Sequence, residues 1–191
     1  GGVAGSKAGL SKGIGKAPAL RYLSEGGRLA VIDQEAPDSS FAEALRSEAG
    51  QNSQRLAYIK ADATDEADVA RAVQEAEAAL GPADILVNNV GFGANPTPIE
   101  TLSLAEWEQF MSINLTSAFL LTRAVVPGMR ERGYGRIVNL ASVAGRSISE
   151  ISNLHYSTAK AAILGFTRRL GFAEAEYGIC VNSVAPGTVF T

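Results

Sequence analysis

The sequence predicts a three-layer α/β/α fold built on a mostly parallel β-sheet, and two observations support this fold class. Short apolar runs that suit strands alternate with stretches of helical periodicity along the whole chain, which is the pattern of successive βαβ units. Near the start, the glycine-rich loop GLSKGIG at residues 9–15 opens a helix, as such folds do after their first strand. The chain has 191 residues, 46% of them hydrophobic, so we expect a single domain over residues 1–191.

Five strands are predicted from apolar runs. They lie near residues 29–33, 56–60, 85–88, 136–141 and 180–184. A further strand should precede the glycine loop, but residues 1–8 are rich in glycine and poor in β-forming side chains, so we expect that strand to be frayed or absent. Pro18 falls in the helix that follows the loop and is tolerated there only within the first turn.

Three longer segments have the periodicity of helices. The clearest follows Thr64, which is a suitable N-cap, and ends at Gly81-Pro82. The residues expected on its buried face are Val69, Val73, Ala76 and Leu80. Two further helices are predicted over about 103–132 and 153–177.

Composition and charge argue against several classes of function. The net charge of -3 and the absence of a basic stripe argue against nucleic acids and anionic membranes as partners. We expect a cytoplasmic protein, because no apolar run suits a membrane span or a secretory signal. The single cysteine and the single histidine exclude an internal disulfide and make a metal site implausible. We expect Cys180 to be a buried core thiol, and His155 to be an ordinary loop or helix-start residue, with substrate contact as the alternative.

The glycine loop is suited to binding phosphate. Its amides and the positive end of the following helix can face a pyrophosphate, and glycine permits a close backbone approach. Eighteen residues after Gly15, the next strand ends in Asp33, whose carboxylate can accept hydrogen bonds from an adenosine ribose diol and would repel a 2′-phosphate. Asp33 therefore favours NAD over NADP, whereas the cation of Lys12 favours NADP. We give Asp33 more weight because a carboxylate facing a phosphate dianion is costly.

Tyr156 and Lys160 are spaced four residues apart in the third predicted helix, so they share one face of it. A free tyrosine has a pKa near 10 and is a poor general base at neutral pH. A lysine cation at about 4 to 5 Å can favour phenolate by on the order of 3 to 4 kcal/mol. The pair therefore suits proton transfer, although the alternative of an exposed helix pair stays open on spacing alone.

Several further motifs follow in a characteristic order. The sequence Asn88-Asn89-Val90-Gly91 comes after a strand, Asn114 lies in the middle helix, and Ser142 follows the next strand. Pro186-Gly187 follows the last strand. With the glycine loop and the tyrosine-lysine pair, this ordered set resembles the short-chain dehydrogenase/reductase family over nearly the whole chain.

The resemblance implies a Rossmann-like fold with strand order 3-2-1-4-5-6 and an NAD-dependent oxidoreductase acting on a secondary alcohol or its ketone. Tyr156 would be the acid/base, Lys160 would lower its pKa and bind the nicotinamide ribose, and Ser142 would hold the substrate oxygen. Asn114 would bind a water that relays protons. The cofactor-binding residues implied by the glycine loop and the resemblance are Gly9, Ser11, Lys12, Gly13, Ile14, Gly15, Asp33, Asp62, Ala63, Asn89, Gly91, Tyr156, Lys160, Pro186, Gly187, Val189 and Thr191. No metal is implied.

The chain departs from the family pattern in places. Ala8 stands where threonine is usual before the first loop glycine, and Val90 where alanine is usual after the paired asparagines. The family's seventh strand and its substrate-covering lid are missing from this sequence, so we expect the protein to continue beyond Thr191. The substrate is therefore open, as is the direction of the reaction.

Other functions remain possible on the sequence. An NADPH-dependent 3-oxoacyl thioester reductase is favoured by Lys12, and a non-catalytic dinucleotide-binding protein is the alternative outside the enzymes. The resemblance implies pairing through the middle and third helices, giving a homotetramer or homodimer. The residues expected to face substrate are Phe92, Ala94, Asn95, Ala144, Ser147, Ile148 and His155.

Overall fold

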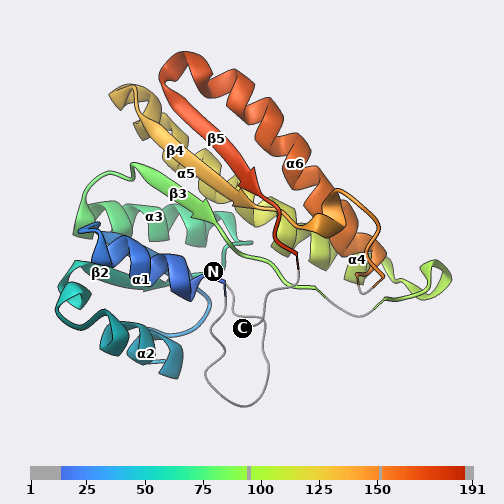
Figure 1. Cartoon of the computed structure of the whole chain (residues 1–191), viewed down its shortest axis with the longest axis horizontal. Helices are drawn as coiled ribbons and strands as arrows, with labels where there is room; N and C mark the ends of the chain where they lie inside the picture. The colour runs from blue at the N-terminus through green and yellow to red at the C-terminus, as the bar shows by residue number, and fades with distance from the viewer. Residues whose placement is uncertain (1–13, 94–95, 151, 188–191) are drawn as a thin grey trace.

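The strands of the computed structural model form two parallel sheets (Figure 1). The structure describes residues 14–93, 96–150 and 152–187. In the first sheet, β1 (Leu29–Asp33) pairs with β2 (Leu56–Lys60). The C-terminal ends of these two strands, Asp33 and Lys60, are opposite each other in the register.

The second sheet has three parallel strands in chain order. These are β3 (Ile85–Asn88), β4 (Gly135–Leu140) and β5 (Ile179–Val184). The neighbours in both sheets are those that the order 3-2-1-4-5-6 requires. The expected first strand, at residues 1–8, lies outside the described residues, so the complete order stays a prediction.

Six α-helices connect the strands within the described residues. They are α1 (Lys16–Ser24), α2 (Ser40–Ala49), α3 (Glu66–Leu80), α4 (Leu104–Met111), α5 (Ser117–Arg132) and α6 (Leu154–Glu174). Between α4 and α5 lies one π-helical turn, Ser112–Thr116. In Figure 1, α5 lies behind β3 and β4, α6 runs along β5, and α1 lies beside α2.

The helix ends agree with the sequence in part. Pro18 is the third residue of α1, within the first turn where proline is tolerated. The prediction that Thr64 caps α3 is wrong: the N-cap is Asp65, whose side chain accepts a hydrogen bond from Asp68 N–H. Thr64 instead donates its hydroxyl to Asp62, because its side chain serves the turn before the helix.

The main core lies between α3, α5 and the second sheet. Val69 and Val73 of α3 are buried there, as predicted, whereas Ala76 and Leu80 are only partly buried. The other large side chains in this core are Leu120, Leu121, Val125, Val126, Met129, Ile137 and Ile179. The continuous helical stretch Leu104–Arg132 has the length and hydropathy of a membrane span, but half of its apolar window is buried inside the protein, as in a core helix.

An ion pair joins the ends of α5 and α6. The guanidinium of Arg130 donates to both carboxylate oxygens of Glu174, each at 2.6 Å, and Glu174 is buried. Arg130 also lies over the ring of Tyr177, 4.7 Å from its centroid. The bidentate geometry fixes the two helices relative to each other at the end remote from residue 156.

One face of the second sheet is uncovered within the described part of the chain. Side chains alternate along each strand, so Ile137 and Ile179 point into the core while Ile85, Val87 and Val184 are 42%, 47% and 51% exposed. The prediction that Cys180 is a core thiol is wrong, because it follows the buried Ile179, points to this uncovered face and is exposed.

A cavity of about 350 Å³ separates the two sheets. Side chains of β1 and β3 line it, together with Tyr22 of α1 and Val125 of α5.

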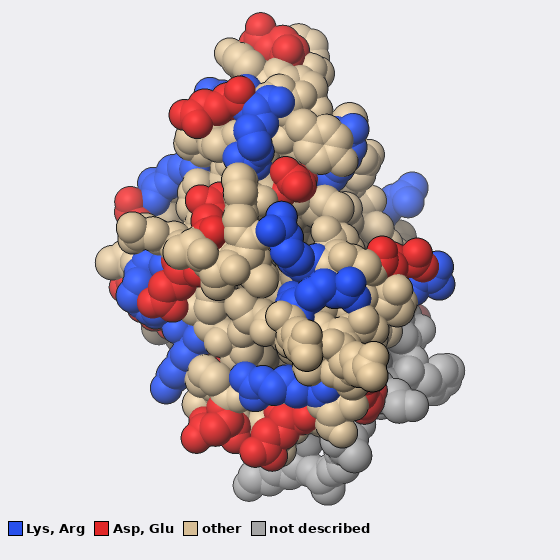
Figure 2. All heavy atoms as spheres, turned by 90° about the vertical axis from the view of Figure 1, so that its left-hand side faces the viewer, with Lys and Arg blue, Asp and Glu red and all other residues tan. Residues whose placement is uncertain are grey.

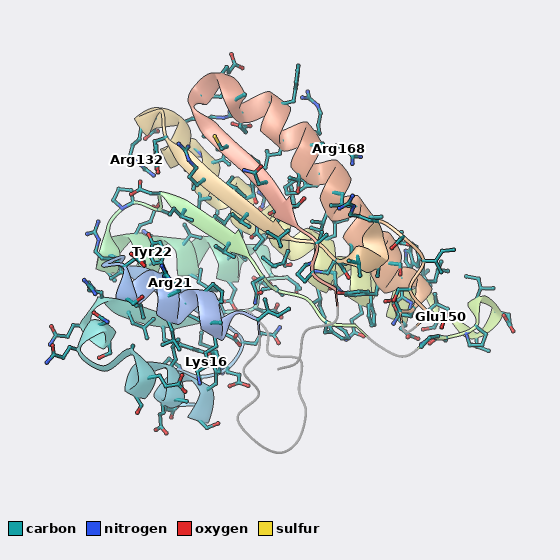
Figure 3. The ribbon with its side chains drawn as sticks, in the orientation of Figure 1. Lys16, Arg21, Tyr22, Arg132, Glu150 and Arg168 are labelled. Atoms are coloured by element: carbon teal, nitrogen blue, oxygen red, sulfur yellow. The ribbon has the colours of Figure 1, made fainter. Side chains whose placement is uncertain are left out.

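On the face of the molecule shown in Figure 2, acidic and basic side chains are interspersed without a patch of one sign. Figure 3 shows Lys16 at the start of α1, where its ammonium pairs with Glu48 of α2.

Candidate active site

The first turns of α6 place Tyr156 and Lys160 on the same side of the helix. Asn153 caps the helix, and its side-chain oxygen accepts a hydrogen bond of 2.8 Å from Tyr156 N–H. Lys160 Nζ lies 5.7 Å from the centroid of the Tyr156 ring. The four-residue spacing therefore brings phenol and ammonium together, as the sequence predicts.

Lys160 is buried, and its ammonium has one acceptor among the residues that the structure describes. Its side chain is 4% exposed, and Nζ donates a hydrogen bond of 2.8 Å to the carbonyl of Leu140, the last residue of β4. Burial removes water from the ammonium and lowers the pKa of Lys160 to about 8. At pH 7 the side chain therefore remains mostly protonated.

The π-helical turn holds Asn114 against the loop after β3. The side chain is buried, and its Nδ2 donates to the carbonyls of Phe92 and Phe110 at 3.1 and 3.2 Å. Its Oδ1 accepts from Phe92 N–H at 3.2 Å. A π-helical turn inserts an extra residue into the helix, which is a common arrangement at functional sites. This turn interrupts at Asn114 the helix that the sequence predicts over about 103–132.

Gly91 occupies the point where Asn114 and Lys160 meet. A Cβ atom at residue 91 would lie 2.7 Å from Asn114 Oδ1 and 2.8 Å from Lys160 Nζ. No side chain fits at these distances. Two residues further on, a Cβ at Gly93 would make ordinary contact with the Tyr156 ring, at 3.9 Å.

The loop after β4 carries Ser142 to the same region. Ser142 is buried, and its Oγ accepts from Ala144 N–H at 3.2 Å. Val143 N–H donates to the carbonyl of Pro186, at 3.0 Å, which places the segment after β5 beside Ser142. A Cβ at Gly145 would lie 2.6 Å from the carbonyl carbon of Lys160. This close packing of the loop on α6 is a site feature that the sequence analysis missed, since an isolated glycine carries no such signal.

The adenosine side of the predicted site lies at the ends of β1 and β2. Asp33 accepts a hydrogen bond from Glu35 N–H at 3.0 Å, and its carbonyl accepts from Ala61 N–H at 2.8 Å. Asp62 Oδ1 accepts from both the amide and the hydroxyl of Thr64. Partial burial opposes ionisation of Asp62, but these hydrogen bonds outweigh it and lower its pKa.

The remaining cofactor-binding predictions are placed as follows. Gly15 is the N-cap of α1, and Ile14 is exposed before it. Gly15 and Asn89 line the cavity between the sheets. Ala63 is buried in the main core, so its methyl group points away from a ligand site. Six predicted residues lie outside the described residues: Gly9, Ser11, Lys12, Gly13, Val189 and Thr191.

The predicted substrate-facing residues do not form one group. Ala144, Ser147 and Ile148 line an open hollow of about 540 Å³ together with Ser157 of α6. Ala94 and Asn95 lie outside the described residues. His155 is the second residue of α6, which confirms its interpretation as a helix-start residue. Its side chain is completely buried and faces Glu106 of α4, which argues against the alternative of a substrate contact.

The donor set fits a nicotinamide dinucleotide. An ammonium has three protons to donate, and Lys160 Nζ makes one hydrogen bond among the described residues, which leaves donors for ribose hydroxyls. At Gly91 the absence of a side chain allows Lys160 Nζ and Asn114 Oδ1 to approach the loop after β3 closely. A cluster of three or more metal-ligating side chains is absent from the residues that the structure describes.

Fold and site together define an oxidoreductase of alcohol and carbonyl groups. The model of the family described as short chain dehydrogenase matches residues 8–191, and this chain belongs to that family. It is 37% identical over 180 residues to 2-dehydro-3-deoxy-L-rhamnonate dehydrogenase (NAD(+)) of Sphingomonas sp., covering 94% of this chain and 69% of that protein. It is 34% identical over 183 residues to 3-oxoacyl-[acyl-carrier-protein] reductase of Synechocystis sp., covering 96% and 72%.

The solved structures agree with this assignment. The crystal structure of levodione reductase superposes with a TM-score of 0.83 at 33% identity, covering 91% of this chain and 66% of that one.

Proposed function

We propose that this chain is an NAD-dependent oxidoreductase that converts a secondary alcohol and its ketone into each other, with Tyr156 as the proton-transferring residue. The observation that carries the proposal is the convergence on Gly91 of Asn114 and Lys160 from two different helices. The Ser142 loop, which packs on α6 at Lys160, completes the arrangement.

Tyr156 transfers the proton to and from the substrate oxygen. In oxidation its Oη takes the proton of the alcohol, and in reduction it returns a proton to the carbonyl oxygen. The ammonium of Lys160 lies 5.7 Å from the centroid of the Tyr156 ring, so a positive charge stands beside the proton-transferring residue. We assign Lys160 the role of the positive charge beside the phenol during proton transfer, and Ser142 Oγ that of orienting the substrate oxygen.

The cofactor supplies the redox chemistry: the nicotinamide ring accepts hydride from the alcohol carbon or gives it to the ketone. The chain's part is to hold it. Lys160 Nζ and the phenol would bind the nicotinamide ribose, and Gly91 leaves room for the Lys160 ammonium beside the loop after β3. Asp33 would bind the adenosine ribose, with Asp62 beside the adenine.

The preference for NAD rests on Asp33, which ends β1 and whose carboxylate would repel a 2′-phosphate. The relative whose name includes NAD(+) is consistent with this preference. Dissociation constants for NADH and NADPH, measured by titration of the same preparation, test it. Tighter binding of NADPH would contradict the preference and favour the second candidate.

That second candidate is an NADPH-dependent 3-oxoacyl thioester reductase. The similarity to a 3-oxoacyl-[acyl-carrier-protein] reductase supports it. An absorbance screen at the nicotinamide band, run with secondary alcohols, polyols, steroids and 3-oxoacyl thioesters, distinguishes the two.

The role of Tyr156 is tested by the substitution Tyr156→Phe. The variant should bind NADH as the parent does and lose turnover; unchanged turnover would contradict the role of Tyr156 as the proton-transferring residue.

Association of subunits is the last part of the proposal. Phe119 of α5 and Phe172 of α6 are 43% and 81% exposed, and exposed aromatic side chains of this size suit an interface. We expect a homodimer or homotetramer that pairs through these helices. Light scattering tests this, and a monomer would contradict it. We also expect a cytoplasmic location.

A further inference from the structure

A fully buried histidine directly precedes Tyr156. His155 is 0% exposed, and neither of its ring nitrogens makes a hydrogen bond among the described residues. Its Nε2 lies 3.4 Å from Oε1 of Glu106 in α4, within ion-pair distance. Buried polar atoms without hydrogen bonds are rare and costly. This imidazole is therefore in an unusual position for a side chain that only fills space.

The imidazole also ends a row of aromatic rings. Its ring meets that of Phe110 edge-on, with centroids 3.9 Å apart and planes at 87°. Phe110 packs in turn on Phe92, at 4.4 Å between centroids. Asn114 holds both the N–H and the carbonyl of Phe92. The row thus connects His155 to the loop after β3.

That loop touches the reacting groups on both sides of Phe92. Gly91 lies against Lys160 Nζ, and Gly93 lies against the Tyr156 ring. A shift of α4 relative to α6 would therefore move this loop as well as the first turn of α6. The contact of His155 Nε2 with Glu106 Oε1, at 3.4 Å, is a polar side-chain contact between the two helices at this point.

We propose that His155 and Glu106 form a latch between α4 and α6 that positions Tyr156 and residues 91–93 for proton transfer. The inference rests on the proposed function, since it assigns both residues a positioning role in that reaction. Neither residue is placed in contact with substrate. A misplacement of about 1 Å at a reacting group can lower turnover on the order of a hundredfold, so a latch of this kind has a measurable effect.

The first test is Glu106→Gln. Glu106 is only partly buried, at 35% exposed, so the variant should fold. We expect kcat to fall about tenfold, while the dissociation constant of NADH and the urea midpoint stay within error of the parent. The matched control is Glu108→Gln, the same chemical change on an exposed position of α4, which should leave kcat unchanged.

A second measurement does not depend on turnover. The chain has one histidine, so its ring signals in a proton-carbon NMR spectrum need no assignment. Glu106→Gln should shift the His155 Cε1–H signal, and Glu108→Gln should not. An unchanged signal in Glu106→Gln would overturn the latch whatever the kinetics show.

The third test is non-additivity. His155→Phe keeps the volume of a ring and removes the polar contact, so it should lower kcat about as much as Glu106→Gln. The double variant should be no worse than either single variant. Independent, multiplying losses would overturn the latch, as would a kcat within twofold of the parent in Glu106→Gln. Absence of turnover in the parent with every substrate would instead contradict the proposed function itself.

Discussion

One amide side chain, that of Asn114, satisfies both backbone polar groups of Phe92. The same side chain also donates to the carbonyl of Phe110. Because the contacts lie in a buried region, Asn114 has a structural role at the site that is separate from any role in binding water. The π-helical turn is what brings its side chain into reach of the loop.

Asn114→Ala should therefore lower both the free energy of unfolding and the turnover. It leaves buried donors and acceptors unpaired, each at a cost of roughly 1 to 3 kcal/mol, so we expect a loss of about 3 kcal/mol in urea unfolding. Asn182→Ala, at an exposed position of β5, is the control and should change stability little. Equal losses in the two variants would show that the Asn114 contacts add nothing.

Gly91→Ala should lower turnover at least tenfold. The added methyl group would overlap Asn114 Oδ1 and Lys160 Nζ, so the ammonium must move away from its present position. Gly165→Ala is a matched control in α6, since a Cβ there meets nothing within 4 Å. The control should keep its turnover and gain a fraction of a kcal/mol in stability, because alanine favours helix over glycine.

Lys160→Met should stabilise the protein at pH 7 while abolishing turnover. The pKa of Lys160 falls from 10.5 to about 8 on folding, so below about pH 8 the folded state holds a buried charge that the unfolded state exposes. Allowing for the lost hydrogen bond to Leu140, we expect a gain on the order of 2 kcal/mol. The parent binds fewer protons folded than unfolded between about pH 8 and 10.5, so its stability relative to the variant should rise through that window. A pH-independent difference between the two would contradict burial of the charge.

Glu174→Gln should loosen the junction of α5 and α6. The substitution removes the buried carboxylate that Arg130 binds through two hydrogen bonds, and we expect a loss of roughly 2 kcal/mol in thermal or urea unfolding. Glu176→Gln, at an exposed neighbouring position, should cost less than about 0.5 kcal/mol. If both variants behave alike, the pair contributes no more than a surface charge.

The sequence predicts the elements that have strong local signals. The short apolar runs between helical stretches predict β1 and β2 at the bounds observed, and predict β4 and β5 to within one residue. The pairing of Tyr156 with Lys160 followed from helical spacing alone. These features depend on near neighbours in the chain, which is why they are readable from it.

Features that depend on distant contacts were not predicted. The burial of His155 depends on Glu106 and Phe110, more than forty residues earlier in the chain, and the exposure of Cys180 depends on which face of β5 is covered. Whether a polar residue beside a catalytic one is buried is decided by the helix that packs against it. Spacing within one segment carries no information about that.

The uncovered face of the second sheet has a practical consequence. Cys180 is the chain's single cysteine and lies on this face, to which the exposed side chain of Val184, at the other end of β5, also points. A thiol-reactive maleimide should therefore report on that face alone, at one site per molecule. Any segment or subunit that comes to rest there would slow the labelling rate, so the chemistry of one sulfur atom can follow assembly of this surface in solution.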